Sequence, residues 1–174
     1  MNMKKLLLLS IAGLMSFSSF ADEQVCHPTV QATTPDSRFE ILGDGSEVKD
    51  TKTNLIWQRC SIGQTWDKTA KTCQGSPKTF ASWKEALTET HKLGNGYRLP
   101  NVKELQSIVE YKCRPFINKK IFVGYDGDVT DWYFSSTPDV RDNNVFSVNF
   151  DKSTTRSVGK LDITNTARAV RSAK

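Results

Sequence analysis

Histidine and the motifs of common hydrolases are scarce in this sequence. Among its 174 residues there are only two histidines, His27 and His91. A Ser-His-Asp triad would need one of them, and no Gly-x-Ser-x-Gly turn accompanies either. A zinc site built on histidine lacks a second imidazole nearby. We therefore expect a protein that is not an enzyme and that holds no cofactor.

Long apolar runs are also missing after residue 21, so we expect no transmembrane segment in the mature chain. At the start, two lysines precede an apolar run over residues 6–15, and Ser19-Phe20-Ala21 places small residues where signal peptidase cleaves. This pattern predicts a signal peptide over residues 1–21. The alternative is an uncleaved anchor, although the run is shorter than the ~20 residues of a membrane span. We expect a secreted or periplasmic protein.

The four cysteines contain no Cys-x-x-Cys pair, which disfavours a zinc ribbon or a thioredoxin-like dithiol. In an oxidising compartment, an even number of cysteines indicates disulfides. Three connectivities are possible. We favour Cys60 with Cys73, because it closes a polar segment that cannot be a core element, and this choice leaves Cys26 with Cys113.

Residues 22–38 are polar and contain Pro28 and Pro35, so we expect an extended arm tied down at Cys26. The folded domain is expected over residues 39–174 and opens with a β-meander, because apolar and polar residues alternate around strong turn signals. The apolar positions of this meander are Phe39, Ile41, Val48, Leu55 and Trp57.

Two helices are predicted in the middle of the chain. Ser82 and Glu85 form one expected capping box, and the helix that follows is stopped at Gly94. Asn101 and Glu104 form a second box, and this second helix is expected to continue until shortly before Pro115.

The last part of the sequence returns to a period of two residues, which is typical of strands. Trp132–Ser135, Val145–Phe150, Thr155–Val158 and Ala167–Arg171 are the candidates, with Phe146 expected on the same face as the other aromatic residue of its strand. Strands, two helices and further strands predict an α+β domain with a mostly antiparallel sheet.

Several stretches, in this order, resemble one family. They are Asn54–Cys60 (Asn-Leu-Ile-Trp-Gln-Arg-Cys), Gly63-Gln64-x-Trp66, Tyr97–Leu105 (Tyr-Arg-Leu-Pro-Asn-Val-Lys-Glu-Leu), Trp132–Pro138 (Trp-Tyr-Phe-Ser-Ser-Thr-Pro), Val148-Asn149-Phe150 and Val170-Arg171. Together they are similar to the Legionella collagen-like protein (Lcl) C-terminal domain family over about residues 39 to 171. The resemblance implies a C-type-lectin-like fold, which agrees with the predicted α+β domain; the disulfides expected from the cysteines would staple it.

The same resemblance implies an adhesion module, since the family's named member is an adhesin that binds sulfated glycosaminoglycans. This chain lacks the Gly-x-y collagen repeat of that member, so trimerisation through a stalk is not implied. Among the motif residues we expect Trp57, Leu99, Trp132 and Phe150 to fill the core, and Arg98 to pair with Glu104.

Asp126, Asp128 and Asp131 lie in a glycine-containing stretch and are weak candidates for a calcium site. The sequence lacks the other ligands of an EF-hand, and it lacks the Glu-Pro-Asn and Trp-Asn-Asp tripeptides of calcium-dependent lectins. We therefore expect a solvated turn here and no bound metal.

Basic residues gather in the last third of the chain and just before it. They are Lys119, Lys120, Arg141, Lys152, Arg156, Lys160, Arg168 and Arg171. Such an excess favours an anionic partner, and outside the cytoplasm this means a sulfated polysaccharide or an acidic envelope or surface protein more than nucleic acid. The alternative is a solvated sheet edge protected by lysine and arginine.

Two functions therefore stay open. The first is a binding module for an anionic glycan or a protein partner, with Lys119, Lys120, Arg141, Lys152 and Arg156 as the ligand-binding residues. The second is a structural subunit of a surface appendage or envelope assembly that makes protein contacts only. The sequence does not give the oligomeric state.

We predict that the exported protein begins at Asp22. Removing residues 1–21 leaves 153 of the 174 residues, and the formal net charge falls from +5 to +3 because two lysines are lost. Mass spectrometry of the exported protein measures this directly. An N-terminus at Met1, or a lipid on Cys26, would contradict the prediction.

Overall fold

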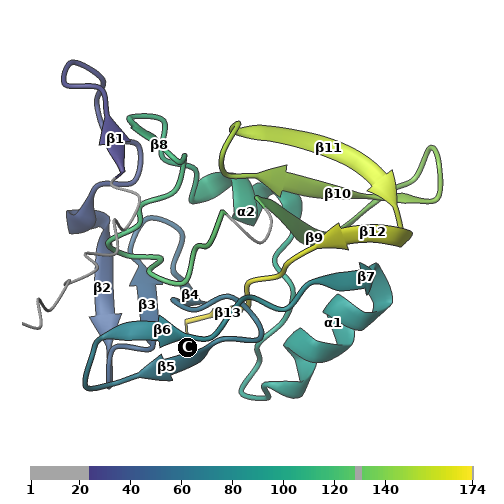
Figure 1. Cartoon of the computed structure of the whole chain (residues 1–174), viewed down its shortest axis with the longest axis horizontal. Coiled ribbons are helices and arrows are strands. Elements are labelled where there is room, and N and C mark those ends of the chain that lie inside the picture. Colours follow the sequence, from purple (N-terminus) through teal and green to yellow (C-terminus); the bar gives the residue numbers. More distant parts are fainter. Residues whose placement is uncertain (1–23, 128–130, 174) are drawn as a thin grey trace, which may run out of the picture.

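The structure, a computed structural model, describes residues 24–127 and 131–173. Its larger sheet has four antiparallel strands in the order β13-β4-β3-β2 (Figure 1). The strands are β2 (Phe39–Leu42), β3 (Glu47–Asp50), β4 (Leu55–Gln58) and β13 (Val170–Ser172). The predicted meander is confirmed, and the last strand of the chain pairs with the third strand of the meander.

A second sheet of three antiparallel strands follows the order β11-β10-β9. Its strands are β9 (Trp132–Asp139), β10 (Asn144–Asn149) and β11 (Thr154–Gly159), and the short helix α2 (Val102–Ser107) packs against β9 and β10. The register of β10 against β9 shifts between Val145 and Ser147. Val148 and Phe150, on the face predicted for Phe146, are buried, while Phe146 itself is only half-buried; Val145 on the other face is buried as well, so both faces of β10 are covered.

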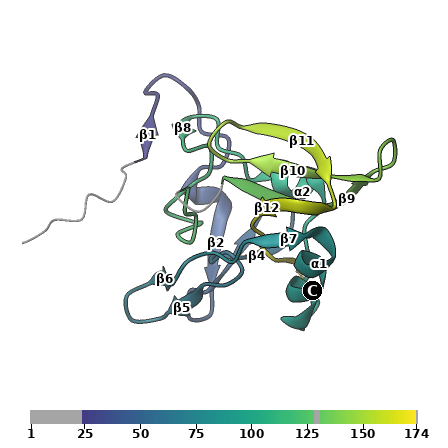
Figure 2. The same cartoon turned by 45° about the vertical axis from the view of Figure 1, so that its right-hand side comes forward.

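Three two-stranded units complete the domain (Figure 2). They are β1 (Val25–Cys26) with β8 (Cys113–Arg114), β5 (Thr65–Asp67) with β6 (Thr72–Gln74), and β7 (Phe80–Ser82) with β12 (Leu161–Asn165). Helix α1 (Trp83–Lys92) follows β7 directly, and a 3-10 turn (Asp36–Arg38) precedes β2. No helix among the residues described here is long and apolar enough to cross a membrane.

Of the two predicted capping boxes, one is complete and the other is only half present. At α2 both halves of the capping box are present between Asn101 and Glu104. At α1 the Ser82 side chain accepts from the backbone N–H of Glu85, but the Glu85 carboxylate pairs with Lys78 at 2.9 Å. The second half of that predicted box is therefore wrong.

Helix α2 also ends at Ser107, well before the predicted end near Pro115. The residues after Ser107 leave the helix because their backbone pairs with residues 116–117. Val109 forms a β-bridge with Ile117, and the N–H of Glu110 donates to the carbonyl of Phe116 at 3.0 Å. These bonds satisfy the backbone without further helical turns.

The core lies between the two sheets and α2, and a smaller cluster lies under α1. The predicted core residues Trp57, Leu99 and Phe150 are almost completely buried. Trp132 is only half-buried, because its ring lies at the surface under the guanidinium group of Arg156, 3.7 Å from the ring centroid.

Both predicted disulfides are confirmed, Cys26–Cys113 and Cys60–Cys73. The second one joins the start of the loop after β4 to strand β6 of the β5–β6 hairpin. An α+β architecture with mostly antiparallel sheets, two helices and two disulfides is thus confirmed. Its C-type-lectin-like identity stays a prediction.

Arg168 is completely buried, although the sequence placed it among the basic surface residues. Its guanidinium group donates to the carbonyl of Gln58 at 3.0 Å and to Oγ of Ser61 at 3.1 Å, and it lies over the ring of Phe122. No carboxylate lies within ion-pair distance of it among the described residues. Burial therefore lowers the pKa of Arg168.

We predict that Arg168→Met lowers the free energy of unfolding by about 2–4 kcal/mol, because buried acceptors lose their donors. Arg114→Met is the matched control. The Arg114 side chain is 67% exposed, so solvent screens its ion pair with Asp151 and the substitution should change stability little. Urea unfolding of both variants measures the difference. An Arg168→Met protein as stable as the wild type would mean that the cost of burying the cation equals the value of its hydrogen bonds.

Candidate anion-binding site

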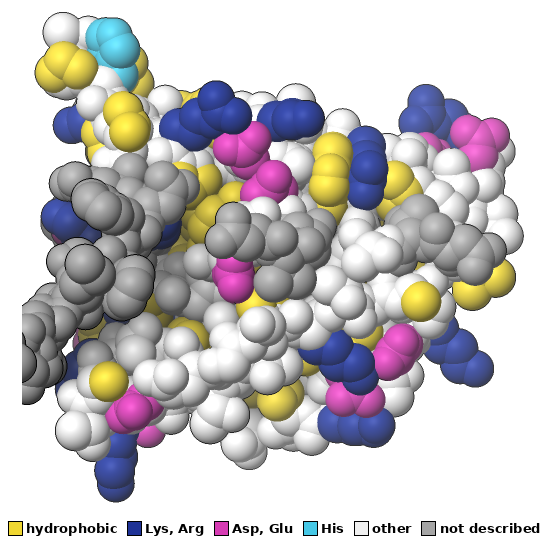
Figure 3. Space-filling view, viewed as in Figure 1, with side chains coloured by type: hydrophobic (Ala, Val, Ile, Leu, Met, Phe, Trp, Pro, Cys, Tyr) yellow, Lys and Arg dark blue, Asp and Glu magenta, His cyan; other side chains and the backbone are white. Residues whose placement is uncertain are grey.

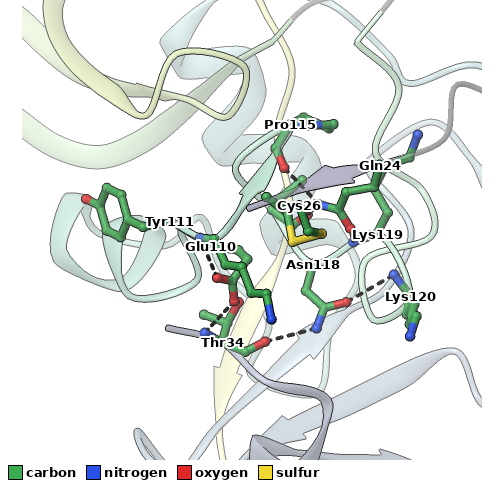
Figure 4. The surroundings of a disulfide bond; sticks show 12 residues. Gln24, Cys26, Thr34, Glu110, Tyr111, Pro115, Asn118, Lys119 and Lys120 are labelled. Atoms are coloured by element: carbon green, nitrogen blue, oxygen red, sulfur yellow. Dashed lines mark hydrogen bonds between the residues drawn. A yellow bond between two sulfur atoms is a disulfide. The ribbon is translucent and has the colours of Figure 1, made fainter. Parts of the chain in front are cut away.

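The N-terminal segment is fastened to the loop after α2 at one end of the molecule. β1 pairs with β8 through the disulfide partners Cys26 and Cys113. The side-chain amide of Gln24 donates to the carbonyls of Pro115 and Ile117 at 2.8 and 2.6 Å (Figure 4). Segments almost ninety residues apart in sequence are thus held as one unit.

Glu110 provides a second attachment for this segment. Its buried carboxylate accepts from the backbone N–H groups of Thr33 and Thr34, from the Thr34 hydroxyl and from the N–H of Lys112 (Figure 4). Burial acts to raise the pKa of Glu110, but these donors outweigh it and hold the pKa below its ordinary value. The carboxylate is therefore ionised and fully used inside the protein.

Asn118 positions the two lysines predicted to bind the ligand, Lys119 and Lys120. Its amide nitrogen donates to the carbonyl of Thr34 at 2.9 Å, and its amide oxygen accepts from the N–H of Lys120 at 3.1 Å (Figure 4). The N–H of Lys119 donates to the side chain of Gln24. The lysine backbone is fixed on both sides, while the Lys120 side chain is 80% exposed.

The loop that carries these lysines rests on a second buried guanidinium group. Arg59 is 7% exposed and donates to the carbonyls of Lys120 and Ile121, as well as to that of Gly45. Burial and the nearby charge of Arg168 lower the pKa of Arg59. Neither arginine has a carboxylate partner among the described residues, so two unneutralised charges lie beneath a surface that is itself basic.

The turn between β10 and β11 lies at the same end of the molecule. The N–H of Phe116 donates to the carbonyl of Phe150, and Arg114 binds Asp151 through two hydrogen bonds of 3.0 Å. The exposed Lys152 follows in this turn. We name the resulting group the basic edge; its members are Lys112, Arg114, Lys119, Lys120 and Lys152.

Two members of the basic edge, Lys112 and Arg114, were missed by the sequence reasoning. A local signal was present, because residues 111–120 contain four basic residues and no acidic one. The basic edge also contains acidic neighbours: Lys120 lies 3.6 Å from Asp36, and Arg114 pairs with Asp151. Both ion pairs are exposed and therefore weak, so an incoming anion can replace them.

The structure does not bring all five predicted ligand-binding residues together. Arg141 lies in the turn between β9 and β10, at the opposite end of β10 from Lys152, which is about 20 Å away along a six-residue strand. Its guanidinium group binds Asp139 and holds the pKa of that carboxyl far below its usual range. Arg156 lies midway along β11 and is half-buried against Trp132.

The basic residues of the last third therefore do not gather on one surface, contrary to the prediction. Arg168 is internal, and Arg171 is bound to Glu47 at 2.9 Å. On the face drawn in Figure 3, Lys and Arg side chains (dark blue) are spread around the rim, and Asp or Glu side chains (magenta) lie beside several of them.

The calcium candidates have other partners where the structure describes them. Asp131 accepts a hydrogen bond of 2.6 Å from the hydroxyl of Tyr125, and burial together with this contact raises the pKa of Tyr125. Asp128 lies outside the described residues. Within the described ranges, no group of three or more His, Cys, Asp or Glu side chains is placed to hold a metal ion.

A shallow, open depression of about 420 Å³ lies elsewhere, between the turn after β3 and helix α2. It is lined by Thr53, Leu55, Asn101, Lys103, Glu104 and Ser107. Most of its polar groups already have partners: Glu104 binds Arg98 at 2.7 Å, as predicted, and also closes the cap of α2. The depression therefore offers a ligand little beyond the ammonium group of Lys103.

Comparison with known families gives one match. A model of the Lcl C-terminal domain matches residues 46–171, which include the three-stranded sheet, most of the four-stranded sheet, both helices and the basic edge. Strand β2 and the segment before it, with Cys26, lie outside the match. A comparison with curated proteins found no match.

We predict that Glu110→Gln lowers the free energy of unfolding by about 2 kcal/mol at pH 7, because an amide offers these N–H donors only one oxygen. The folded-state pKa of Glu110 is lowered. Its stabilisation is therefore fully present above the unfolded-state pKa of about 4.3 and is lost as the pH falls through the folded-state pKa. Urea unfolding from pH 7 to pH 3 should show wild type and variant converging in acid. Glu40→Gln, on the exposed part of β2, is the control, and a gap that stays constant with pH would contradict the assignment.

Proposed function

Because the chain belongs to the Lcl C-terminal domain family, we propose that it is a secreted or periplasmic binding module that engages an anionic, sulfated glycan through the basic edge, without catalysis and without calcium. The predicted signal peptide and the two disulfides support an oxidising, extracytoplasmic location. The family resemblance supports adhesion as the role.

The observation that carries this proposal is the combination of exposed and buried cations at one end of the domain. Lys119 and Lys120 are presented by a loop whose carbonyls are bound by Arg59. The buried carboxylate of Glu110 at this end keeps its negative charge, but it accepts from backbone and hydroxyl groups and pairs with neither Arg59 nor Arg168. A sulfate group approaching the basic edge meets five basic side chains above two buried guanidinium groups, so the field there is positive on balance.

A structural role in an envelope or surface assembly is the second candidate. It is supported by β2, which lies at the edge of the four-stranded sheet and carries Ile41, whose exposed fraction is 46%. Exposed edge strands can pair with a strand of another protein. Cross-linking in envelope extract, with Ile41→Lys as the variant that blocks the edge, tests this role.

We predict that the mature domain is retained on heparin at about 50 mM salt, a concentration at which charges still interact over roughly 10–15 Å before salt screens them. The triple variant Lys119→Glu, Lys120→Glu, Lys152→Glu should lose this retention, because several contacts of about 0.2–1 kcal/mol each are replaced by repulsion. For the wild type, the logarithm of affinity should fall linearly with the logarithm of salt concentration, since binding releases counterions.

The control makes the same change in net charge elsewhere. Lys68, Lys84 and Lys103 are exposed residues outside the basic edge, and their replacement by Glu should leave most of the retention. Addition of EDTA should change nothing. A wild-type domain that flows through the column would end the glycan proposal, and equal losses in the two triple variants would show that net charge alone determines binding.

A further inference from the structure

A projecting part of the molecule overlaps the basic edge at Lys112 and Arg114 and adds exposed apolar side chains to it. We name it the arm lobe; it consists of residues 25–33 together with residues 111–114. The lobe stands out from the body of the domain in both views (Figures 1 and 2). Residues 24–35 contain no Lys, Arg, Asp or Glu, so the lobe is uncharged on its N-terminal side.

Three large apolar side chains of the arm lobe are exposed. The exposed fraction is 73% for Val25, 38% for Val30 and 54% for Tyr111. Figure 3 shows hydrophobic side chains beside a histidine on this projection. Tyr111 also makes an edge contact with Phe116, which orients its ring. These three side chains share one projection, and apolar groups exposed together mark interaction sites.

The arm lobe is also rigidly attached. The disulfide Cys26–Cys113 joins its two strands, and the N–H of His27 donates to the carbonyl of Lys112 at 2.8 Å. The hydroxyl of Thr33 donates to the carbonyl of Val109 at 2.8 Å. The apolar side chains are therefore held away from the body, and they cannot be covered by folding back onto it.

We propose that the arm lobe binds an anionic lipid bilayer. Val25, Val30 and Tyr111 enter the interface between head groups and acyl chains, while the basic edge contacts the phosphate groups. Residues 111–120, with four basic and no acidic residues, supply the complementary charge at the base of the lobe. Tyrosine suits this depth because its ring is apolar and its hydroxyl reaches water.

The shape of the arm lobe favours a bilayer over a protein surface. A stable protein interface buries about 800 Å² on each partner and usually needs a broad complementary face. Here a few apolar side chains lie on a narrow projection, which a fluid interface can accept without a matching shape. This inference goes beyond glycan binding, in which these apolar side chains have no role.

The test is co-sedimentation of the mature, disulfide-bonded protein with vesicles at about 50 mM salt. We expect binding to vesicles of phosphatidylglycerol mixed with phosphatidylcholine and no binding to phosphatidylcholine alone. Val25→Ser and Tyr111→Ser should each weaken binding about tenfold, since each removes one inserted side chain. Val140→Ser is the matched control, because Val140 is 91% exposed on the distant β9–β10 turn and should not matter.

Heparin retention of the same variants separates this inference from the proposed function. Val25→Ser and Tyr111→Ser should leave retention unchanged, and loss of heparin binding with vesicle binding intact would sink only the glycan proposal. The lipid inference is overturned if the wild type does not bind anionic vesicles. It is equally overturned if both lobe variants bind them as well as the wild type, which would mean charge attraction alone. Capture of an envelope protein that depends on Val25, without vesicle binding, would assign the lobe to a protein partner.

Discussion

The buried guanidinium group of Arg168 is the interaction on which the rest of this domain depends. It binds the backbone at the end of β4, contacts the aromatic core at Phe122 and Tyr133, and reaches Ser61 next to the Cys60–Cys73 disulfide. Because hydrogen bonds from a cation are strong in a dry interior, this group fixes a turn that has little apolar area of its own. Arg59 acts in the same way nearer the surface: its guanidinium group donates to the carbonyls of Lys120 and Ile121 and fixes the loop that carries the lysines.

This arrangement links stability to the proposed site. The buried guanidinium groups of Arg59 and Arg168 bind carbonyl groups and have no carboxylate partner among the described residues. Their positive charge therefore adds to the electrostatic potential at the surface above them. The one buried carboxylate described at this end, Glu110, binds the N-terminal segment and not these guanidinium groups, so the positive charges there outnumber the negative ones. The same hydrogen bonds that hold the domain together thus give one end its positive character.

Much of the architecture could be predicted from local pattern. The alternation around Phe39, the cap at Asn101 and the spacing of the cysteines led to the correct meander, the correct start of α2 and the correct disulfides. The candidate site was harder to predict, because the sequence does not show whether an arginine side chain points into the core or into solvent. Arg168 and Arg141 look alike in the chain, yet one is internal and the other is bound to Asp139 at the far end of β10. The early end of α2 was missed for a related reason, since it depends on a bridge to Ile117 that is tertiary.

The position of Arg168 and Val170 near the end of the chain also governs when the domain can form during synthesis. Until the ribosome has made these residues, the carbonyl of Gln58 has no buried donor and β4 has no partner on one side. The residues made before them therefore complete the four-stranded sheet and its buried turn only after Arg168 and Val170 have been added.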